Sequence, residues 1–376
     1  MATDGPRVLV IGGGAGGAAA ALALHKAGIA TSVYEAHPHS TEHYGAYLSV
    51  QSNGMDALRA IDADRVVAAA AFPSRAAEVF SGVDGKRLGG VRHDGDSGGI
   101  VLTRAELARV LQVEAVRRGV PVEHGRRLVG IDATADGVSV RFAGGGTAEG
   151  DLVVGADGVW SQVRTFIDPA APGPRYLGHV VAFGHASTVR EPTPPDAGHF
   201  YRGRRASYGY RSFRDGTTRW YASLTMPELP QAEIQGMNST DWRRHVLEFV
   251  AEDPTPFPGV VEATDRGILG VNAYELPPLP SWYTSTAVLL GDALHASSSR
   301  FGQGSSMAFE DAVVLARCLR DVPNAVDAFR AYERERRPRV EDVAGLAAGR
   351  PPAHHPLDDH SWLADHHLDW DEPITR

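Results

Sequence analysis

The chain has 376 residues, of which 43% are hydrophobic and 22% are charged, which is the composition of a globular protein long enough for two structural domains. Its net charge of −9 at pH 7 disfavours nucleic acid or an anionic membrane as a partner. A single cysteine, Cys318, excludes a disulfide framework and a cysteine-based metal site within one chain. No apolar stretch reaches the length of a membrane span, so we expect a cytoplasmic protein without a membrane partner.

The N-terminal residues predict a strand, a turn, a helix and a second strand. Residues 7–11, RVLVI, form a continuous apolar run, as in a parallel strand that is buried on both faces. Residues 15–26 are rich in alanine, the strongest helix former, and Gly28 suits the left-handed residue that ends a helix. The second strand, at 30–35, completes a βαβ unit. This order predicts an α/β fold with a parallel sheet.

Three glycines in the turn of this unit have the spacing of a dinucleotide-binding motif. Gly12 permits a tight turn, Gly14 lets the backbone approach a pyrophosphate, and Gly17 lets the helix pack on the strand. Glu35 follows at about the twenty-residue distance at which a carboxylate binds ribose hydroxyls. A similar run at 142–150, FAGGGTAEG, has no helix after it, and we interpret it as a hairpin turn. The first motif therefore predicts a dinucleotide, but it does not separate NAD from FAD.

From residue 176 to about residue 272 the pattern changes. The stretches 179–188, 198–213 and 217–226 predict antiparallel strands rich in aromatic residues, and a helix follows at 241–250. Residues 286–295, TAVLLGDALH, then return to a buried parallel strand, and helices are expected at 306–322 and 325–347. A cofactor-binding fold is thus interrupted by a sheet domain and then resumed.

Two later motifs accompany the first. Residues 151–164, DLVVGADGVWSQVR, contain an Asp-Gly pair, and residues 289–312, LLGDALHASSSRFGQGSSMAFEDA, contain Gly-Asp and then Gly-Gln-Gly. Together with the N-terminal glycines and the helix LTRAELARVL at 102–111, this order resembles the class A flavoprotein monooxygenases, the family of para-hydroxybenzoate and salicylate hydroxylases. The resemblance covers roughly residues 6–345.

The resemblance implies a Rossmann-like FAD-binding domain of the GR2, para-hydroxybenzoate hydroxylase type, interrupted by an antiparallel-sheet substrate domain and followed by C-terminal helices. It implies six segments: a first FAD-binding part (1–72), a substrate-sheet segment (73–98), a second FAD-binding part (99–175), a substrate domain (176–275), a third FAD-binding part with a helix (276–345) and a C-terminal tail (346–376).

By position, the resemblance also implies the contacts with FAD. Glu35 would bind the adenosine ribose, Arg104 the flavin linker, and Asp292 the ribityl chain or the pyrophosphate. Taken alone, Asp157 also fits a simple turn and Asp292 a helix N-cap. The full set of implied cofactor-binding residues is Gly12, Gly14, Ala15, Gly17, Glu35, Arg104, Asp157, Gly158, Asp292, Gly302, Gln303, Gly304 and Ser305.

The implied reaction is hydroxylation of a small aromatic or polyketide-like substrate. NADH or NADPH would reduce FAD, O2 would add to form a C4a-hydroperoxide, and its terminal oxygen would pass to the substrate. Three departures from the family pattern stand out: Ser299 replaces a proline, Ser306 an asparagine, and Tyr47 a glycine close to the expected flavin ring. They keep open an alternative in which FAD is structural and serves a non-redox cyclisation, a rearrangement or ligand binding. The chain is expected to be a monomer or a homodimer.

Candidate residues around the substrate come from the motif loops and the inserted sheet. His295, Tyr47 and Tyr210 are the catalytic candidates, in an acid–base arrangement, although His295 also fits a structural role. Only about half of the residues on each strand would face the flavin. The substrate-binding candidates are Phe301, Ser299, Tyr201, Tyr208, Arg211 and Trp220. No metal is expected, because the tail histidines lack a fixed scaffold and fit solvated or packing roles: His354, His355, His360, His366 and His367.

Overall fold

A five-stranded parallel sheet forms the centre of the larger part of the molecule. The computed structural model describes residues 5–38, 46–92, 99–134, 137–187, 197–264, 267–355 and 361–374. The strand order is β18-β12-β1-β2-β8; β18, β12 and all of β1 after Arg7 are buried, as their apolar sequences predict, whereas β2 is buried only at its end. The strands are β1 (Arg7–Ile11), β2 (Ala30–Tyr34), β8 (Val122–Glu123), β12 (Leu152–Gly155) and β18 (Ala287–Leu289).

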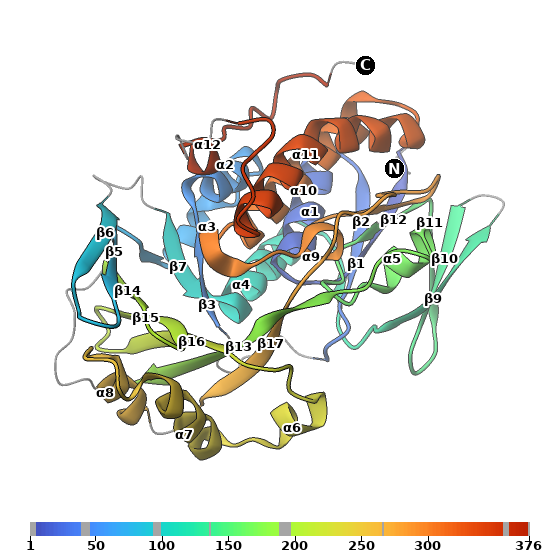
Figure 1. Cartoon of the computed structure of the whole chain (residues 1–376). Coiled ribbons are helices and arrows are strands. Elements are labelled where there is room, and N and C mark those ends of the chain that lie inside the picture. The colour runs from blue at the N-terminus through green and yellow to red at the C-terminus, as the bar shows by residue number, and fades with distance from the viewer. Residues whose placement is uncertain are drawn as a thin grey trace.

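Helices pack against this sheet and against one another (Figure 1). Helix α1 lies beside α4 and α10, and Gly16 of α1 permits close contact with Ala308 of α10. Helix α11 packs on α10. The helices of this part are α1 (Ala15–Lys26), α2 (Ser52–Ala60), α3 (Asp64–Ala69), α4 (Arg104–Arg117), α5 (Gln162–Ile167), α9 (Asp292–His295), α10 (Gly304–Asp321) and α11 (Ala325–Ala347).

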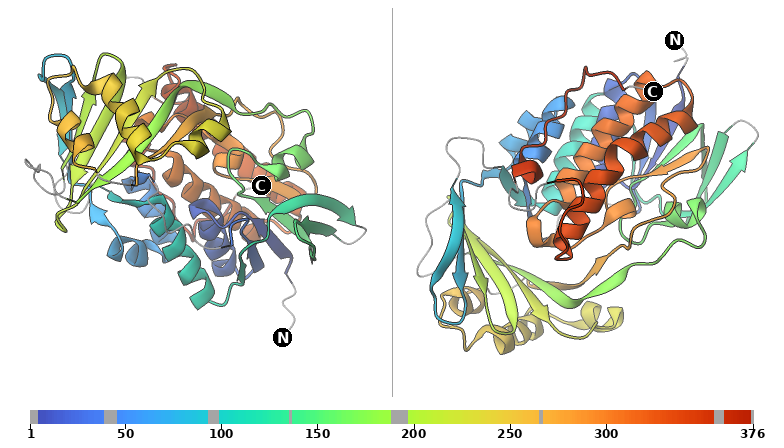
Figure 2. Two further views of the ribbon diagram at one scale, coloured as in Figure 1. Left: turned by 90° about the horizontal axis from the view of Figure 1, so that it is seen from below. Right: turned by 45° about the horizontal axis from the view of Figure 1, so that its top comes forward.

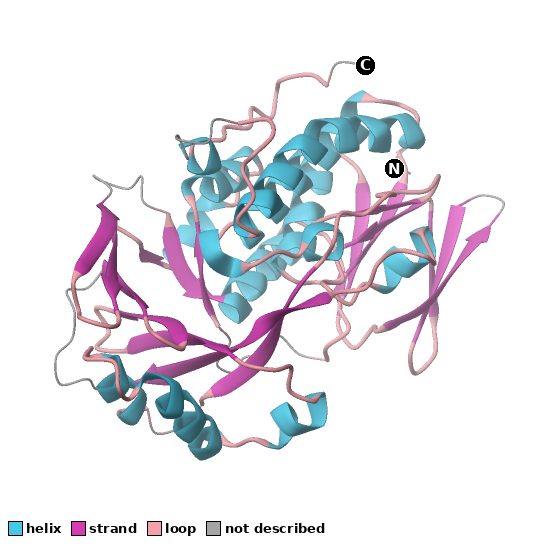
Figure 3. Cartoon of the chain, in the orientation of Figure 1, coloured by secondary structure: helices cyan, strands magenta, loops and turns pink. Residues whose placement is uncertain are grey.

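Two small sheets flank the parallel one (Figure 3). The glycine run at 142–150 forms the turn between β10 and β11, and its three consecutive glycines all have positive φ, which confirms the predicted hairpin. The first small sheet has the order β11-β10-β9 and the second β3-β7-β4. Their strands are β9 (Leu128–Thr134), β10 (Gly137–Phe142), β11 (Thr147–Gly150), β3 (Tyr47–Val50), β4 (Phe72–Pro73) and β7 (Ile100–Thr103).

A seven-stranded sheet forms the second part of the molecule. Its order is β17-β13-β16-β15-β14-β5-β6, antiparallel except for the β14–β5 pair. Helices α7 and α8 cover its outer face, and its inner face looks toward the parallel-sheet part (Figure 2). The elements are β5 (Ala76–Ser81), β6 (Arg87–Arg92), β13 (Arg175–Ala186), β14 (Ala197–Arg202), β15 (Ala206–Ser212), β16 (Thr218–Thr225), β17 (Leu269–Glu275), α6 (Gln231–Gly236), α7 (Ser239–Val250) and α8 (Phe257–Glu262).

The C-terminal tail returns to the parallel-sheet part, although its sequence shows no clear periodicity. It contains the short helix α12 (Ser361–Ala364), and it buries Leu363 and Leu368 in the main core. Within the described ranges, no helix has both the length and the apolar character that crossing a membrane requires.

Candidate functional site

The glycine turn between β1 and α1 has the close backbone approaches that its sequence predicts. Gly12 has φ of 103°, and a Cβ there would overlap the carbonyl oxygen of Ala156. A Cβ at Gly17 would overlap the carbonyl oxygen of Gly12. A Cβ at Gly14, in contrast, would meet no atom of the described chain within 4 Å. Two of the glycines are thus required by packing, whereas Gly14 borders open space.

Helix α1 begins at Ala15 beside that open space. No side chain of the described residues caps its start, so its first N–H groups are available to an anion. Glu35, at the end of β2, accepts hydrogen bonds from the N–H groups of Gly13 (2.7 Å) and His37 (2.8 Å). These bonds fix the Glu35 carboxylate beside the glycine turn, the position that a ribose-binding carboxylate requires.

The Gly-Asp motif and the start of α4 meet at an ion pair. Arg104, the first residue of α4, donates to the Asp292 carboxylate at 2.9 Å, and both side chains are partly exposed. Gly291 has φ of 58°, which turns the chain from β18 into α9. The structure therefore brings together Arg104 and Asp292, which are 188 residues apart in sequence.

The Gly-Gln-Gly motif forms the start of α10. Gly302 has φ of 62°, and α10 begins at Gly304 with no side-chain cap among the described residues. Gln303 is buried: its amide oxygen accepts from Asn53 of α2 (2.9 Å), and its amide nitrogen donates to the carbonyl of Leu363 in the tail (3.2 Å). Gly304 is exposed and Ser305 half-buried, so a second uncapped helix start faces open space.

Ser306, one of the departures from the family pattern, has a clear structural role. Its hydroxyl accepts the backbone N–H of Gln51 (3.1 Å) at the start of α2. A Cβ at Gly54 would overlap that hydroxyl, so α2 and α10 pack closely at this point. The small serine thus permits the close approach of the two helices.

Asp157, in the Asp-Gly motif, contacts the start of α5. Its carboxylate accepts from the Ser161 hydroxyl (2.5 Å) and from the backbone N–H groups of Gln162 (2.7 Å) and Val163 (3.2 Å). Burial raises the pKa of Asp157, although these hydrogen bonds oppose the rise. Gly158 follows with φ of 78°. This geometry matches the turn interpretation of Asp157 and leaves cofactor contact by this loop a prediction.

His295 lies in the interior rather than on an open surface. Its Nε2 is 2.6 Å from the Asp311 carboxylate, and Asp311 also accepts from Arg336 (2.8 Å) and from the Gly291 N–H (2.9 Å). Burial favours the neutral imidazole, but the charge and hydrogen bond of Asp311 outweigh it, so the pKa of His295 is raised. His295 therefore ties the Gly-Asp loop to α10, and this geometry favours its structural role.

Four aromatic substrate candidates lie on the outer face of the seven-stranded sheet. They are buried with α7 and α8; the Tyr208 hydroxyl donates to Asp253 (2.9 Å), and Trp220 Nε1 donates to Thr264 (2.9 Å). This position differs from the expected one, because the face that each strand presents is set by the docking of the two helices. The four residues are Tyr201, Tyr208, Tyr210 and Trp220.

The inner face carries the alternate residues of the same strands. Tyr221 follows Trp220 on β16, and its ring lies 6.3 Å from the ring of Tyr47 on β3. Arg211 also belongs to this face and donates to Ser74 (3.0 Å) and to the Ala76 carbonyl (3.3 Å). Tyr221 is not among the substrate candidates predicted from the sequence, although its alternation with Trp220 was the available signal.

Two other substrate candidates lie between α9 and α10. Ser299 begins a short 3₁₀ helix, Ser299–Phe301, and is exposed. Phe301 is partly buried and packs against the main core, and the guanidinium of Arg300 lies 5.7 Å from the centre of its ring. Both precede the open start of α10, and their contact with a substrate stays a prediction.

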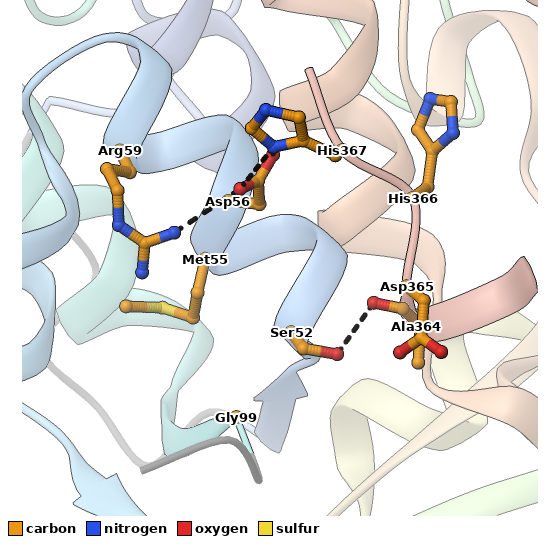
Figure 4. A pocket seen from close by; sticks show the side chains of 9 residues that line it. All are labelled: Ser52, Met55, Asp56, Arg59, Gly99, Ala364, Asp365, His366 and His367. Carbon is orange, nitrogen blue, oxygen red and sulfur yellow. Dashed lines mark hydrogen bonds and ion pairs between the residues drawn. The ribbon is translucent and has the colours of Figure 1, made fainter. Parts of the chain in front are cut away.

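Two of the tail histidines pair with carboxylates. His355 Nδ1 is 2.8 Å from Asp342, and His367 Nδ1 is 2.9 Å from Asp56 of α2. Burial lowers the pKa of His366 to about 4. His367 and His366 line a pocket of about 350 Å³ between α2 and the tail (Figure 4). Among the described residues no cluster of three potential ligands could hold a metal ion, and His360 lies outside them.

The comparisons with known proteins agree on one family. A model described as FAD binding domain matches residues 6–347. The aurachin C monooxygenase/isomerase of Stigmatella aurantiaca is 33% identical over 340 residues, covering 88% of this chain and 86% of that protein. A FAD-dependent urate hydroxylase of Klebsiella pneumoniae is 29% identical over 350 residues, covering 92% and 89%. The chain spans about half the length of the zeaxanthin epoxidases it also matches, 53% for that of Spinacia oleracea.

The structure of Klebsiella pneumoniae HpxO with FAD and uric acid superimposes with a TM-score of 0.81 at 26% identity, covering 98% of this chain and 93% of that chain. A 2,6-dihydroxypyridine-3-hydroxylase from Arthrobacter nicotinovorans has the same fold, with a TM-score of 0.77 at 19% identity and full coverage of both chains.

Proposed function

This chain belongs to the FAD-binding family of flavoprotein monooxygenases, and we propose that it consumes NADH or NADPH and O2 to hydroxylate a small aromatic substrate. It is an oxidoreductase whose cofactor is FAD. We place the substrate beside the contact of Tyr47 with Tyr221, where β3 of one part meets the inner face of the seven-stranded sheet at β16.

The observation that carries this proposal is the pair of uncapped helix starts. Helices α1 and α10 both begin at glycine-rich turns, and a Cβ at Gly14 would stand in open space. The start of α1 fits a pyrophosphate, and the start of α10 fits a flavin edge that gains negative charge on reduction. These features support FAD as the ligand, and we assign Glu35 to the ribose and Arg104 and Asp292 to the linker of the cofactor.

Bound FAD, once reduced, would supply the electrons that activate O2. The protein supplies position, exclusion of water and charge. Arg211 and Arg219 both lie on the inner sheet face, so that face favours a substrate with an electron-rich or anionic oxygen. Burial raises the pKa of Tyr221 to about 12, so its hydroxyl stays protonated at neutral pH and can donate a hydrogen bond. These groups orient the substrate and do not act as strong bases.

Anaerobic reduction of the FAD-loaded protein tests the proposal. NADH and NADPH are each added with and without uric acid, 2,6-dihydroxypyridine, salicylate or para-hydroxybenzoate, and the flavin absorbance is followed. We expect one donor to bleach the flavin and one class of ring compound to accelerate the bleaching. Admission of air should then restore the oxidised spectrum and release a product that carries one oxygen atom from O2. Flavin that stays oxidised with both donors and every probe would favour the structural role of FAD instead.

A further inference from the structure

Tyr47 lies where the two parts of the molecule meet. It is the first residue of β3, it pairs with Thr103 of β7, and the N–H of Arg104 donates to the carbonyl of its neighbour Ala46 (3.0 Å). Successive side chains of a strand point to opposite faces. Because Leu48 packs against the main core, Tyr47 points to the opposite side of β3. There its ring meets the ring of Tyr221 edge-on, at an interplanar angle of 63°.

The hydroxyl of Tyr47 is buried, yet no group of the described residues forms a hydrogen bond with it. A buried hydroxyl without a partner costs roughly 1–3 kcal/mol, so folded proteins rarely keep one. Tyr47 as a whole is half-buried, so other atoms of this residue reach accessible surface. A ligand at that surface would supply the missing partner.

The protonation state of Tyr47 indicates what this partner must be. Burial raises the pKa of Tyr47 far above its ordinary value; the neighbouring Tyr221 adds to the rise, and Arg211 only partly opposes it. The group is therefore a neutral phenol, which offers its proton to an acceptor and cannot serve as a base near neutral pH. The positive charge of Arg211 on the same side favours an acceptor oxygen that carries negative charge.

We propose that the Tyr47 hydroxyl is the specificity-determining donor of the substrate site, and that it selects planar ring compounds with a carbonyl or phenolate oxygen on the ring edge. This inference rests on the proposed function for the place of the substrate. It goes further, because it names the group that the substrate must present and gives Tyr47 a recognition role. A ring without that oxygen leaves the hydroxyl unpaired and binds more weakly, as for other sites built around a buried donor.

The test is a binding measurement on the oxidised, FAD-loaded protein without NADH or NADPH. The probes are 2-hydroxyquinoline and its parent quinoline, which differ by one ring oxygen, and binding is followed through the change in flavin absorbance. We expect the wild-type protein to bind the oxygenated probe at least about tenfold more tightly, the equivalent of about 1.4 kcal/mol. Tyr47→Phe should lose this preference while its affinity for quinoline and its FAD content stay unchanged.

Tyr176→Phe is the matched control. The Tyr176 hydroxyl donates to the carbonyl of Met226 (2.9 Å), away from Tyr47, so this variant should discriminate like the wild-type protein. Three results would overturn the inference: equal binding of both probes by the wild-type protein, full discrimination by Tyr47→Phe, or loss of FAD rather than of discrimination in that variant. Since no reductant is present, these results are independent of whether the flavin can be reduced, which tests the proposed function separately.

Discussion

The imidazole of His295 and the carboxylate of Asp311 form an ion pair of 2.6 Å that joins the Gly-Asp loop to α10 in the interior of the protein. The side chain of His295 is 8% exposed and that of Asp311 is fully buried. Arg336 and Glu310 extend the network toward α11, with an ion pair of 2.6 Å between them. A histidine that carries charge in this network holds the loop that ends β18 in place.

The first prediction concerns how the stability of this pair depends on pH. Because the pKa of His295 is raised above its ordinary value of 6.5, the pair stabilises the fold fully below that value, and the stabilisation is lost as pH rises through the raised pKa. The pKa of Asp311 is lowered, despite its burial, by His295 and Arg336, so its contribution is present above 3.8 and is lost only in strong acid.

We therefore expect His295→Gln to lower the free energy of unfolding by about 3 kcal/mol at about pH 5.5. This value is at the lower end of the cost of breaking a buried ion pair, because Asp311 keeps its ion pair with Arg336. At about pH 9 the difference between wild type and variant should shrink. Urea unfolding at both pH values measures it. A difference that is the same at both would mean that folding does not shift the pKa of His295, and a difference that grows with pH would mean that folding lowers it.

The second prediction separates the two kinds of glycine in the first turn. Gly14 has φ of −60°, which any residue adopts, and its Cβ position is open. We expect Gly14→Ala to keep or slightly raise the stability of the protein without FAD and to weaken FAD binding at least about tenfold, because the methyl group enters the space of the pyrophosphate.

Gly17→Ala is the comparison variant. Its Cβ would overlap the Gly12 carbonyl, so it should destabilise the fold by about 1–3 kcal/mol whether or not FAD is bound. Thermal unfolding and FAD titration of both variants measure the two effects. If Gly14→Ala bound FAD normally, the open space beside α1 would not be the pyrophosphate site.

The sequence contains enough to predict the cofactor-binding part of the fold. Buried parallel strands are uniformly apolar, and glycines such as Gly12 and Gly17 are required by local contacts, so both leave a direct pattern in the chain. The inserted sheet could not be oriented in the same way. Trp220 and Tyr221 are adjacent aromatic residues on opposite faces of the sheet. Only the docking of α7 and α8 decides which of them packs under these helices and which lies on the inner face.

The role of the tail escaped prediction for another reason. Several of its contacts use backbone carbonyls: Trp362 accepts from Arg339 (2.7 Å), and Leu363 accepts from both Arg339 (3.1 Å) and Gln303 (3.2 Å). Carbonyl groups are common to all residues, so such contacts leave no side-chain pattern. The pairing of Gln303 with this distant segment therefore could not be read from the Gly-Gln-Gly motif.

The third prediction concerns Arg104 and Asp292. Their ion pair is partly exposed, and pairs of this kind contribute about 0–1 kcal/mol to folding. We expect Arg104→Ala to change the stability of the protein without FAD very little. If Arg104 binds the linker as proposed, the variant should also weaken FAD binding clearly, because the guanidinium is removed. Arg109→Ala, on the same helix and paired locally with Glu106, serves as the control. Equal FAD affinities of the two variants would remove Arg104 from the cofactor site.

The last prediction joins the tail to the flavin site. Leu363 is buried, and its carbonyl holds Gln303 immediately before the open start of α10. Leu363→Ala should cost about 2–3 kcal/mol of stability through loss of buried side-chain contacts. It should also weaken FAD binding, because the segment whose backbone carbonyl accepts from Gln303 would be held less firmly. Asp365→Ala, two residues along at an exposed position, should change neither quantity. Urea unfolding and FAD titration of both variants distinguish the two effects. Weaker FAD binding by Leu363→Ala, at temperatures where this variant is fully folded, would show that the tail positions the Gly-Gln-Gly loop. Normal FAD binding would limit the role of the tail to stabilising the fold.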